Sequence, residues 1–282
     1  MSCVLLVLFI LGLTVPAFAQ TEKEIVSQYL QKYEKERIKK IGFLVLNGSY
    51  GRLNPENDYN NFALRQSSLI TDLSGGTEEL ERVYRSKELF LGFGMMVAKK
   101  SAVTVGLNYW LKMGSSNVGD YNISLNLSTA EDEYDYELKS EVRVYGFSAH
   151  FDQYLINAPD NSGYLNGFAL KAGLGVGYYF ANWELWDGFA GYNETTGEPE
   201  IVNGNLDGST LGFTVGLSGE MPLPVAGLIL EASAKYLYLN FGNVTWYNSN
   251  DEEVVAQFYD EQVELDLSGP RAQIGFKRYF AW

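Results

Sequence analysis

The chain has 282 residues and a net charge of −14, with 35 acidic against 21 basic side chains. Such an anionic surface repels phosphates, which excludes nucleic acid as a partner. The single cysteine, Cys3, lies in a segment that we expect to be removed, so the mature chain has no disulfide and no thiolate metal site. The counts of Gly 29, Tyr 20 and Phe 16 against Pro 7 are typical of a strand-rich protein.

The N-terminal segment has the features of an export signal. Residues 4–18 form an apolar run, and Ala17-Phe18-Ala19 supplies the small-x-small pattern of a signal-peptidase site. The run is shorter than the ~20 apolar residues that a membrane-spanning helix needs. We therefore predict a signal peptide over residues 1–19, cleaved near Ala19.

Residues 20–40 differ from everything that follows. Thr21 and Glu24 fit a capping box at the start of a helix. Apolar residues then repeat at helical spacing, at Val26, Leu30 and Tyr33. We predict a short amphipathic helix in the periplasm, which is either a solvated lead-in or a plug or docking element for a partner.

From residue 41 the apolar residues alternate with other types. The clearest segments are residues 88–97, 103–112, 168–180, 211–218 and 228–238. One face of each strand carries large apolar residues, while the other carries mainly Gly, Ser, Thr, Asn and isolated charges. A soluble sheet would place its bulk inside and many charges in water. A narrow membrane barrel needs apolar bulk outside and small polar residues inside, so the pattern predicts transmembrane strands of about ten residues.

Two predicted strands interrupt this pattern. Val142-Arg143-Val144 does not continue the alternation that runs from Tyr145 to Phe151. In the last strand, Leu265 and Leu267 are out of step with the residues after Ala272. A bulge at Ser268-Gly269-Pro270 could shift the register there.

The connections between strands alternate between short and long. The short ones are residues 99–101, 153–163 and 221–224, and the long ones are residues 54–87, 114–140, 182–209 and 242–261. Short periplasmic turns, long external loops and an even strand count characterise transmembrane barrels. We predict an all-β, antiparallel up-and-down barrel of eight strands over residues 41–282. Ten strands is the alternative, if residues 62–70 and 123–127 add a hairpin instead of pairing above the membrane.

Aromatic residues gather where the strands are expected to leave the bilayer. We assign Trp183, Trp186, Tyr238 and Phe241 to an outer belt, and Phe151, Tyr154, Phe280 and Trp282 to a periplasmic belt. Two belts of amphipathic rings at headgroup level are expected of a membrane barrel.

The last strand alternates Ala272, Ile274, Phe276, Phe280 and the terminal Trp282. Together with the export signal and the loop pattern, it resembles the small eight-stranded outer-membrane proteins typified by the OmpA transmembrane domain and OmpX. The resemblance covers residues 41–282 in pattern only, and Arg278 departs from it. It implies a bacterial outer-membrane location among lipids and lipopolysaccharide. It also implies that Ile274, Phe276, Phe280 and Trp282 are the signal read by the barrel-assembly machinery.

Several inward positions carry charges. They are Lys112, Lys171, Glu220, Glu231, Lys235, Arg271 and Lys277. Buried charges are tolerated only when they are paired and hydrogen-bonded, so we predict a bridged network that fills the narrow lumen. The alternative is a narrow, passive channel for small solutes.

The one histidine of the chain, His150, follows Ser148 by two residues. This pair resembles, in reverse order, the His-x-Ser pair of outer-membrane lipid A deacylases. We place His150 inside the barrel at the periplasmic end, away from the outer leaflet, with Ser or Glu as its partner. We therefore expect no enzymatic activity and no metal, since zinc ligands are lacking. Lipid modification is the less favoured alternative.

The long loops contain two acidic runs, at residues 131–137 and 251–253. Such runs are usually solvated faces, but their carboxylates could bind divalent cations or a surface ligand. The sequence thus predicts a monomeric outer-membrane barrel without a cofactor. Its role would be structural or surface-interacting, exercised through four long external loops.

Overall fold

The computed structural model describes residues 42–61, 63, 82–98, 100–123, 132–156, 167–187, 191–192, 199–200, 203–223, 228–242, 244–247, 253–255, 257–258 and 261–280. Side chains are described for these residues except within 115–139, 185–204 and 246–262. The predicted signal peptide over residues 1–19, the predicted helix over residues 20–40 and Trp282 lie outside this set. No helix among the described residues is long and apolar enough to cross a membrane.

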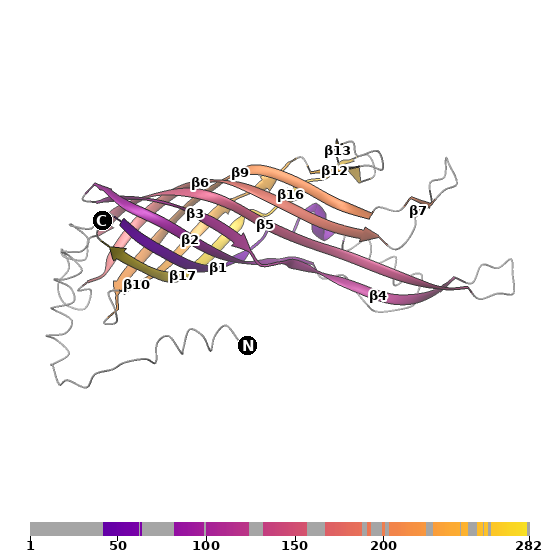
Figure 1. Ribbon diagram of the computed structural model, residues 1–282, viewed down its shortest axis with the longest axis horizontal. Coiled ribbons are helices and arrows are strands. Elements are labelled where there is room, and N and C mark those ends of the chain that lie inside the picture. The colour runs from indigo at the N-terminus through magenta and orange to yellow at the C-terminus, as the bar shows by residue number, and fades with distance from the viewer. Residues whose placement is uncertain are drawn as a thin grey trace, which may run out of the picture.

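Eight antiparallel strands form a closed barrel (Figure 1). They are β1 (Gly42–Arg52), β2 (Arg85–Ala98), β3 (Ser101–Trp110), β5 (Asp132–Ile156), β6 (Ala169–Asp187), β9 (Asn203–Pro222), β10 (Leu228–Tyr238) and β17 (Gly269–Phe280). Each strand pairs with the next one in this series, and β17 pairs with β1 to close the wall. The prediction of an eight-stranded up-and-down barrel is confirmed.

The wall extends into regions that the sequence assigned to loops. β4 (Met113–Ile123) follows β3 after a break at Leu111 and Lys112, and it forms a long hairpin with β5. Strands β6 and β9 pair as far as Trp186 and Asn203. The predicted loops over residues 114–140 and 182–209 are therefore partly strands, because backbone pairing continues after the side chains become polar.

Smaller strands complete the outer end of the barrel. They are β7 (Gly191–Tyr192), β8 (Pro199–Glu200), β11 (Asn240–Phe241), β12 (Thr245–Tyr247), β13 (Glu253–Val255), β14 (Gln257–Phe258), β15 (Glu261–Gln262) and β16 (Leu265–Asp266). In Figure 1, β4, β7, β12 and β13 lie at the end opposite the C-terminal end of β17.

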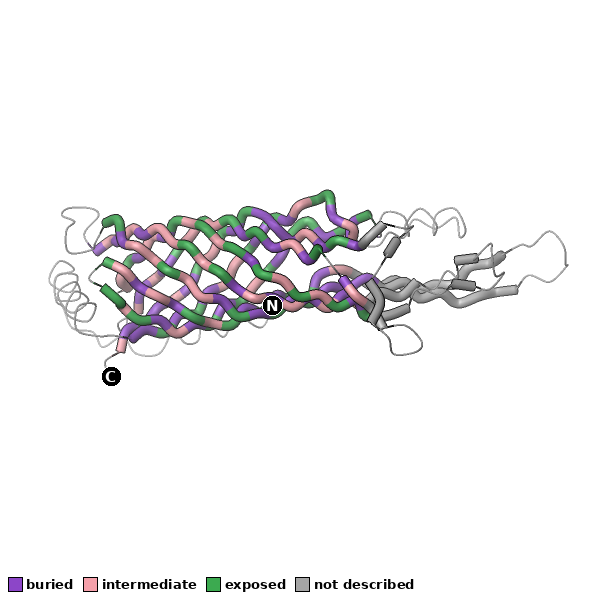
Figure 2. Tube along the Cα trace, turned by 90° about the horizontal axis from the view of Figure 1, so that it is seen from above, coloured by how far each residue is buried: buried purple, intermediate pink, exposed green. Residues whose placement is uncertain are grey.

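Exposed and buried residues alternate along the barrel strands (Figure 2). The exposed ones include many large apolar side chains, such as Leu107 and Leu174, which are both 63% exposed. A continuous apolar exterior is unstable in water, but it matches the hydrocarbon of a bilayer. The outward face of the barrel is therefore a lipid-facing band.

The polarity of the two faces reverses toward the outer end. In β6 the outward side chains are apolar from Leu170 to Phe180, and then Asn182 and Glu184 follow on the same face. The inward face changes in the opposite direction and ends in buried Trp183. The strands thus leave lipid and enter water, where apolar side chains must be buried inside.

This reversal explains the two strands that interrupted the predicted pattern. Val142 and Val144 point inward and Arg143 outward, in the same phase as the rest of β5. Leu265 and Leu267 share the inward face with Arg271 of β17. The alternation is continuous and the bulge predicted near residues 268–270 is wrong, because the surroundings change and the register does not.

Candidate functional site

Four buried charges meet inside the barrel toward its periplasmic end. Glu220 and Glu231 face each other directly across β9 and β10, a like-charge pair that would be destabilising alone. Lys171 lies between them, with its Nζ 3.2 Å from Glu220 and 2.9 Å from Glu231. Lys277 Nζ lies 2.5 Å from Glu220 and 3.5 Å from Glu231. Two cations therefore bridge the two opposed carboxylates.

A fifth charged residue and a tyrosine extend this network. Asp152 accepts a hydrogen bond of 2.8 Å from Lys171 Nζ. The Tyr154 hydroxyl donates to Glu220 at 2.9 Å. We call Asp152, Lys171, Glu220, Glu231 and Lys277 the lumen charge network. Its members come from β5, β6, β9, β10 and β17, which are consecutive in the wall, so their inward side chains converge.

The periplasmic end is closed by apolar and aromatic side chains. Phe43 and Tyr279 pack edge to face with ring centroids 5.2 Å apart, and Lys277 Nζ lies 4.4 Å from the centre of the Phe43 ring. Tyr154 is only 2% exposed and belongs to this cluster. Its assignment to the periplasmic aromatic belt is therefore wrong, because its position in β5 faces the lumen.

A polar layer lies above the lumen charge network. Arg271 bonds Ser86 at 3.0 Å and Glu88 at 3.4 Å, and its guanidinium stacks 4.1 Å from the Trp110 ring. Lys235 lines a cavity of about 40 Å³ in the same layer. Such a volume holds only about one or two waters.

His150 is part of this polar layer. Its Nε2 lies within hydrogen-bonding distance of the Ser148 hydroxyl, at 3.0 Å. The same hydroxyl accepts a hydrogen bond of 2.8 Å from the Asn108 side-chain amide. Phe90 packs edge-on against the imidazole, with ring centroids 5.6 Å apart. The histidine thus has a hydroxyl partner inside the lumen.

Large apolar side chains fill the outer end of the lumen. They include Tyr59, Trp110, Trp183, Leu239 and Phe241, all at most 1% exposed. Trp183 Nε1 donates to Ser140 Oγ at 3.0 Å, and the Tyr59 hydroxyl donates to the Ser140 carbonyl at 2.6 Å. We call this group the outer plug. Trp183 and Phe241 were assigned to the outer belt, which is wrong because both occupy inward positions.

The other residues of the predicted belts and terminal signal divide into three groups. Tyr238, Phe151 and Ile274 are well exposed on the outer face, while Phe276 and Phe280 are half-buried there. The side chain of Trp186 and all of Trp282 lie outside the described residues. The role of residues 274–282 in barrel assembly stays a prediction.

One residue of the predicted lumen set lies elsewhere. The side chain of Lys112 is 51% exposed and pairs with Glu141 at 2.6 Å. β3 ends at Trp110, and the inward position after the break belongs to Met113. Lys112 therefore leaves the lumen because the alternation is interrupted between β3 and β4.

Several interior residues were not among the predicted lumen residues. Asp152 is in phase with His150, and Glu88 is in phase with Phe90, so the alternation alone could have placed both inside. Tyr59 was beyond reach, because it comes from a helical turn at residues 58–61 that enters the outer plug between two strands.

Comparisons with known proteins find distant similarity to outer-membrane proteins of solved structure. No protein-family model matches the sequence, and no curated protein matches it. The outer-membrane protein OprG from Pseudomonas aeruginosa is similar in structure at 14% identity, over 86% of this chain and 98% of that chain, with a TM-score of 0.41. Ail, the attachment invasion locus protein of Yersinia pestis, matches at 10% identity over 85% and 99%, with a TM-score of 0.35. The outer-membrane protease OmpT from Escherichia coli matches at 9% identity over 86% and 95%, with a TM-score of 0.33.

These similarities are too distant to assign an activity, and the location follows from the molecule itself. All backbone groups in hydrocarbon must be paired internally, which a closed barrel achieves. The lipid-facing band surrounds such a barrel here, and the interior holds the polar and charged residues. The chain is an integral outer-membrane β-barrel with the architecture of the small eight-stranded barrels.

Proposed function

We propose that this protein is a non-conducting outer-membrane barrel that acts at its outer end, in a structural or surface-interaction role. The observation that supports this proposal is the filled lumen. The apolar and aromatic cluster around Phe43 and Tyr279, the lumen charge network, the polar layer and the outer plug follow one another along the barrel axis. A solute would have to displace all four.

The charged residues argue against the alternative of a narrow channel. Lys171 and Lys277 are almost fully buried and held by carboxylates on two neighbouring strands. Separating such pairs in a medium of low dielectric costs several kcal/mol per ion. Residues that line a conducting pore would instead need to face continuous water.

The inward face of β5 presents Ser148, His150 and Asp152, the residue types of a hydrolytic triad. Their bonding does not support that chemistry. The Asp152 carboxylate bonds Lys171, and the Ser148 hydroxyl bonds Asn108. Inside the lumen the site adjoins a cavity of about 40 Å³, which is too small for a lipid or a peptide. The open hollow of about 320 Å³ that His150 also lines has apolar Val103 and Leu174 around it, and neither Ser148 nor Asp152 lines it. We therefore favour a non-enzymatic role.

Conductance tests the proposal directly. The mature chain, residues 20–282, is refolded into a planar lipid bilayer, and folding is checked by the heat-dependent shift in gel mobility. We expect no stable conductance. Stable ohmic conductance that changes in Lys171→Gln or Glu231→Gln, but not in the rim variant Lys112→Gln, would establish a channel through the lumen instead.

The predictions on the acidic runs, the monomeric state and barrel assembly remain proposals. The side chains of the acidic runs at residues 131–137 and 251–253 lie outside the described residues. Calcium titration tests whether these runs bind divalent cations or a surface ligand. Sedimentation tests the monomeric state, and assembly assays test recognition by the barrel-assembly machinery.

A further inference from the structure

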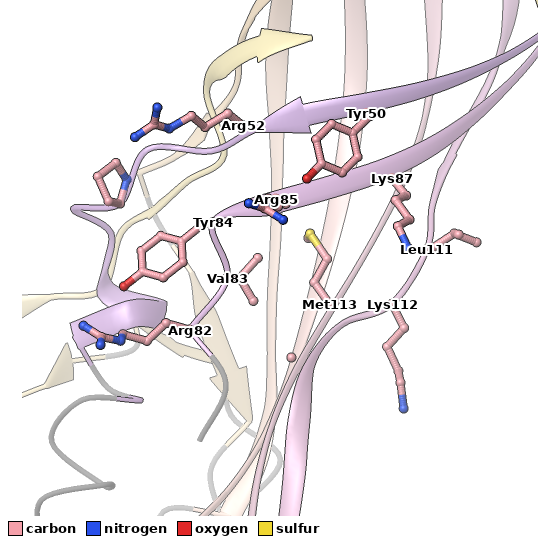
Figure 3. Close-up of a pocket in the computed structure, with 12 residues that line it drawn as sticks. Tyr50, Arg52, Arg82, Val83, Tyr84, Arg85, Lys87, Leu111, Lys112 and Met113 are labelled. Carbon is pink, nitrogen blue, oxygen red and sulfur yellow. The ribbon is translucent and has the colours of Figure 1, made fainter. Parts of the chain in front are cut away.

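A large recess opens at the outer rim of the barrel, between β2 and the start of β4 (Figure 3). Its volume is about 1100 Å³. Five cationic side chains line it: Arg52, Arg82, Arg85, Lys87 and Lys112. They are five of the 21 basic residues in a chain whose net charge is −14, so positive charge is concentrated here. We call this feature the rim recess.

The rim recess exists because strand pairing ends earlier on one side of β2 than on the other. β1 and β2 stay paired up to Arg52 and Arg85. β2 and β3 are paired only up to Glu88 and Trp110, with a last backbone bond of 2.8 Å from Leu111 N to the Lys87 carbonyl. Beyond it, the described part of β4 pairs with β5 alone. The wall therefore separates between β2 and β4.

The positive charge of the rim recess is only partly compensated. Lys112 pairs with Glu141, and Arg82 lies 5.8 Å from the centre of the Tyr84 ring. No described carboxylate lies within 4.0 Å of the charged nitrogens of Arg52, Arg85 or Lys87. Among the described residues, the five cations that line the opening and the one carboxylate bound to Lys112 leave four positive charges, which favours an anionic ligand.

The rim recess lies at the level where the lipid-facing band ends. Toward the outer end of β2, the outward positions hold exposed Leu89, then Lys87 and finally Arg85. On β1, Tyr50 is followed by Arg52, and Tyr50 and Leu111 both line the opening and are exposed. In Figure 3, Tyr50 and Leu111 lie beside the cationic side chains. The site thus joins an apolar lower edge to a cationic upper part.

This arrangement fits an anionic amphiphile better than a free ion. Guanidinium groups bind phosphate through two parallel hydrogen bonds, and lysine adds a point charge. The apolar lower edge gives acyl chains a surface that a free phosphate or a polysaccharide would not use. The shape and chemistry therefore indicate a lipid whose headgroup carries several phosphates.

We propose that the rim recess binds a phosphorylated glycolipid of the outer leaflet, with Arg52, Arg85 and Lys87 at its phosphates and Tyr50 and Leu111 against its acyl chains. The inference does not depend on whether the lumen conducts. It requires only that this end of the barrel faces the outer leaflet, as the short turns at the other end indicate.

The test uses the refolded mature chain in detergent micelles and a fluorescent lipid A carrying two phosphates as the probe. We expect saturable binding that weakens about tenfold in Arg85→Gln/Lys87→Gln, since two charge-assisted bonds to phosphate are lost. The matched control is Lys100→Gln/Arg143→Gln. It removes the same charge from a periplasmic turn and from the outer face of β5, and its affinity should stay within about twofold of the unaltered protein.

Three results would overturn the inference. The first is an equal loss in the control pair, which would mean that only net charge matters. The second is equal binding of lipid A stripped of its phosphates. The third is binding of a sulfated polysaccharide, but not of lipid A, with loss in Arg85→Gln/Lys87→Gln. The gel-mobility shift confirms folding of each variant, and bilayer conductance on the same samples reports separately on the closed lumen.

Discussion

Replacing Lys277 by Met tests the lumen charge network most directly. Lys277 is fully buried and bridges Glu220 and Glu231 from β17. The network holds two lysines and three carboxylates, so its formal charge is +2 − 3 = −1. Lys277→Met changes this to −2 and leaves Lys171 as the remaining bridging cation.

The expected cost follows from what is left behind. Removing one partner of a buried ion pair costs about 3–5 kcal/mol, because the other charge stays buried without compensation. Methionine has a similar volume, so loss of packing contributes little. The control is Arg143→Met, which breaks the exposed pair with Glu184, whose side chains are 55% and 25% exposed. It should cost no more than about 1 kcal/mol.

The assay is urea unfolding in lipid vesicles, followed by tryptophan fluorescence and gel mobility. A second change, Glu220→Gln on the Lys277→Met background, restores the formal charge to −1, and its amide oxygen can still accept the bond from Tyr154. We expect it to recover at least half of the lost free energy of unfolding. Two results would contradict this account of the lumen charge network. One is a cost of Lys277→Met no larger than that of Arg143→Met, and the other is a double variant less stable than the single one.

Three further outcomes test the interior. A variant that keeps Trp183 as its one tryptophan should resist quenching by brominated lipids, whereas one that carries its tryptophan at position 107 should be quenched, because Leu107 faces lipid. Phe241→Ala should lower the free energy of unfolding by about 3–5 kcal/mol through the cavity it leaves in the outer plug, and a loss below 1 kcal/mol would contradict the packing. A Cβ added at Gly106 of β3 would lie 2.5 Å from the Leu91 carbonyl oxygen of the neighbouring strand β2, whereas the nearest atom to a Cβ added at Gly48 is 4.0 Å away. Gly106→Ala should therefore reduce the folded fraction on gels, and Gly48→Ala should leave it unchanged.

The sequence was sufficient to predict the barrel because a strand has a side-chain period of two. Lys171, Glu220, Glu231 and Lys277 stand at inward positions of uninterrupted strands, so alternation alone placed them together. Which of these residues pair with one another could not be predicted from the sequence, since the pairing depends on the register of β6, β9, β10 and β17 in a closed wall.

The aromatic residues show where the inference failed. An aromatic side chain near the end of a strand suits both a headgroup belt and a buried interior. Trp183 is in phase with Lys171, so its inward direction was already encoded in the alternation. Proximity to the end of a strand does not distinguish a headgroup belt from a buried interior, whereas the phase of the alternation does. Lys112 failed for a different reason, because a break between β3 and β4 is invisible to a periodic pattern.

The length of β5 determines how far from the membrane a partner can bind the molecule. Of its 25 residues, those from Asp132 to Val144 precede Tyr145, the first aromatic residue on its lipid-facing side. Thirteen residues of strand span roughly 43 Å, which at a tilt of about 45° amounts to roughly 30 Å of height. The hairpin of β4 and β5 therefore holds its far end about one bilayer thickness above the hydrocarbon. With this end on the outside of the cell, as we propose, a partner that binds it would need no access to the lipid surface.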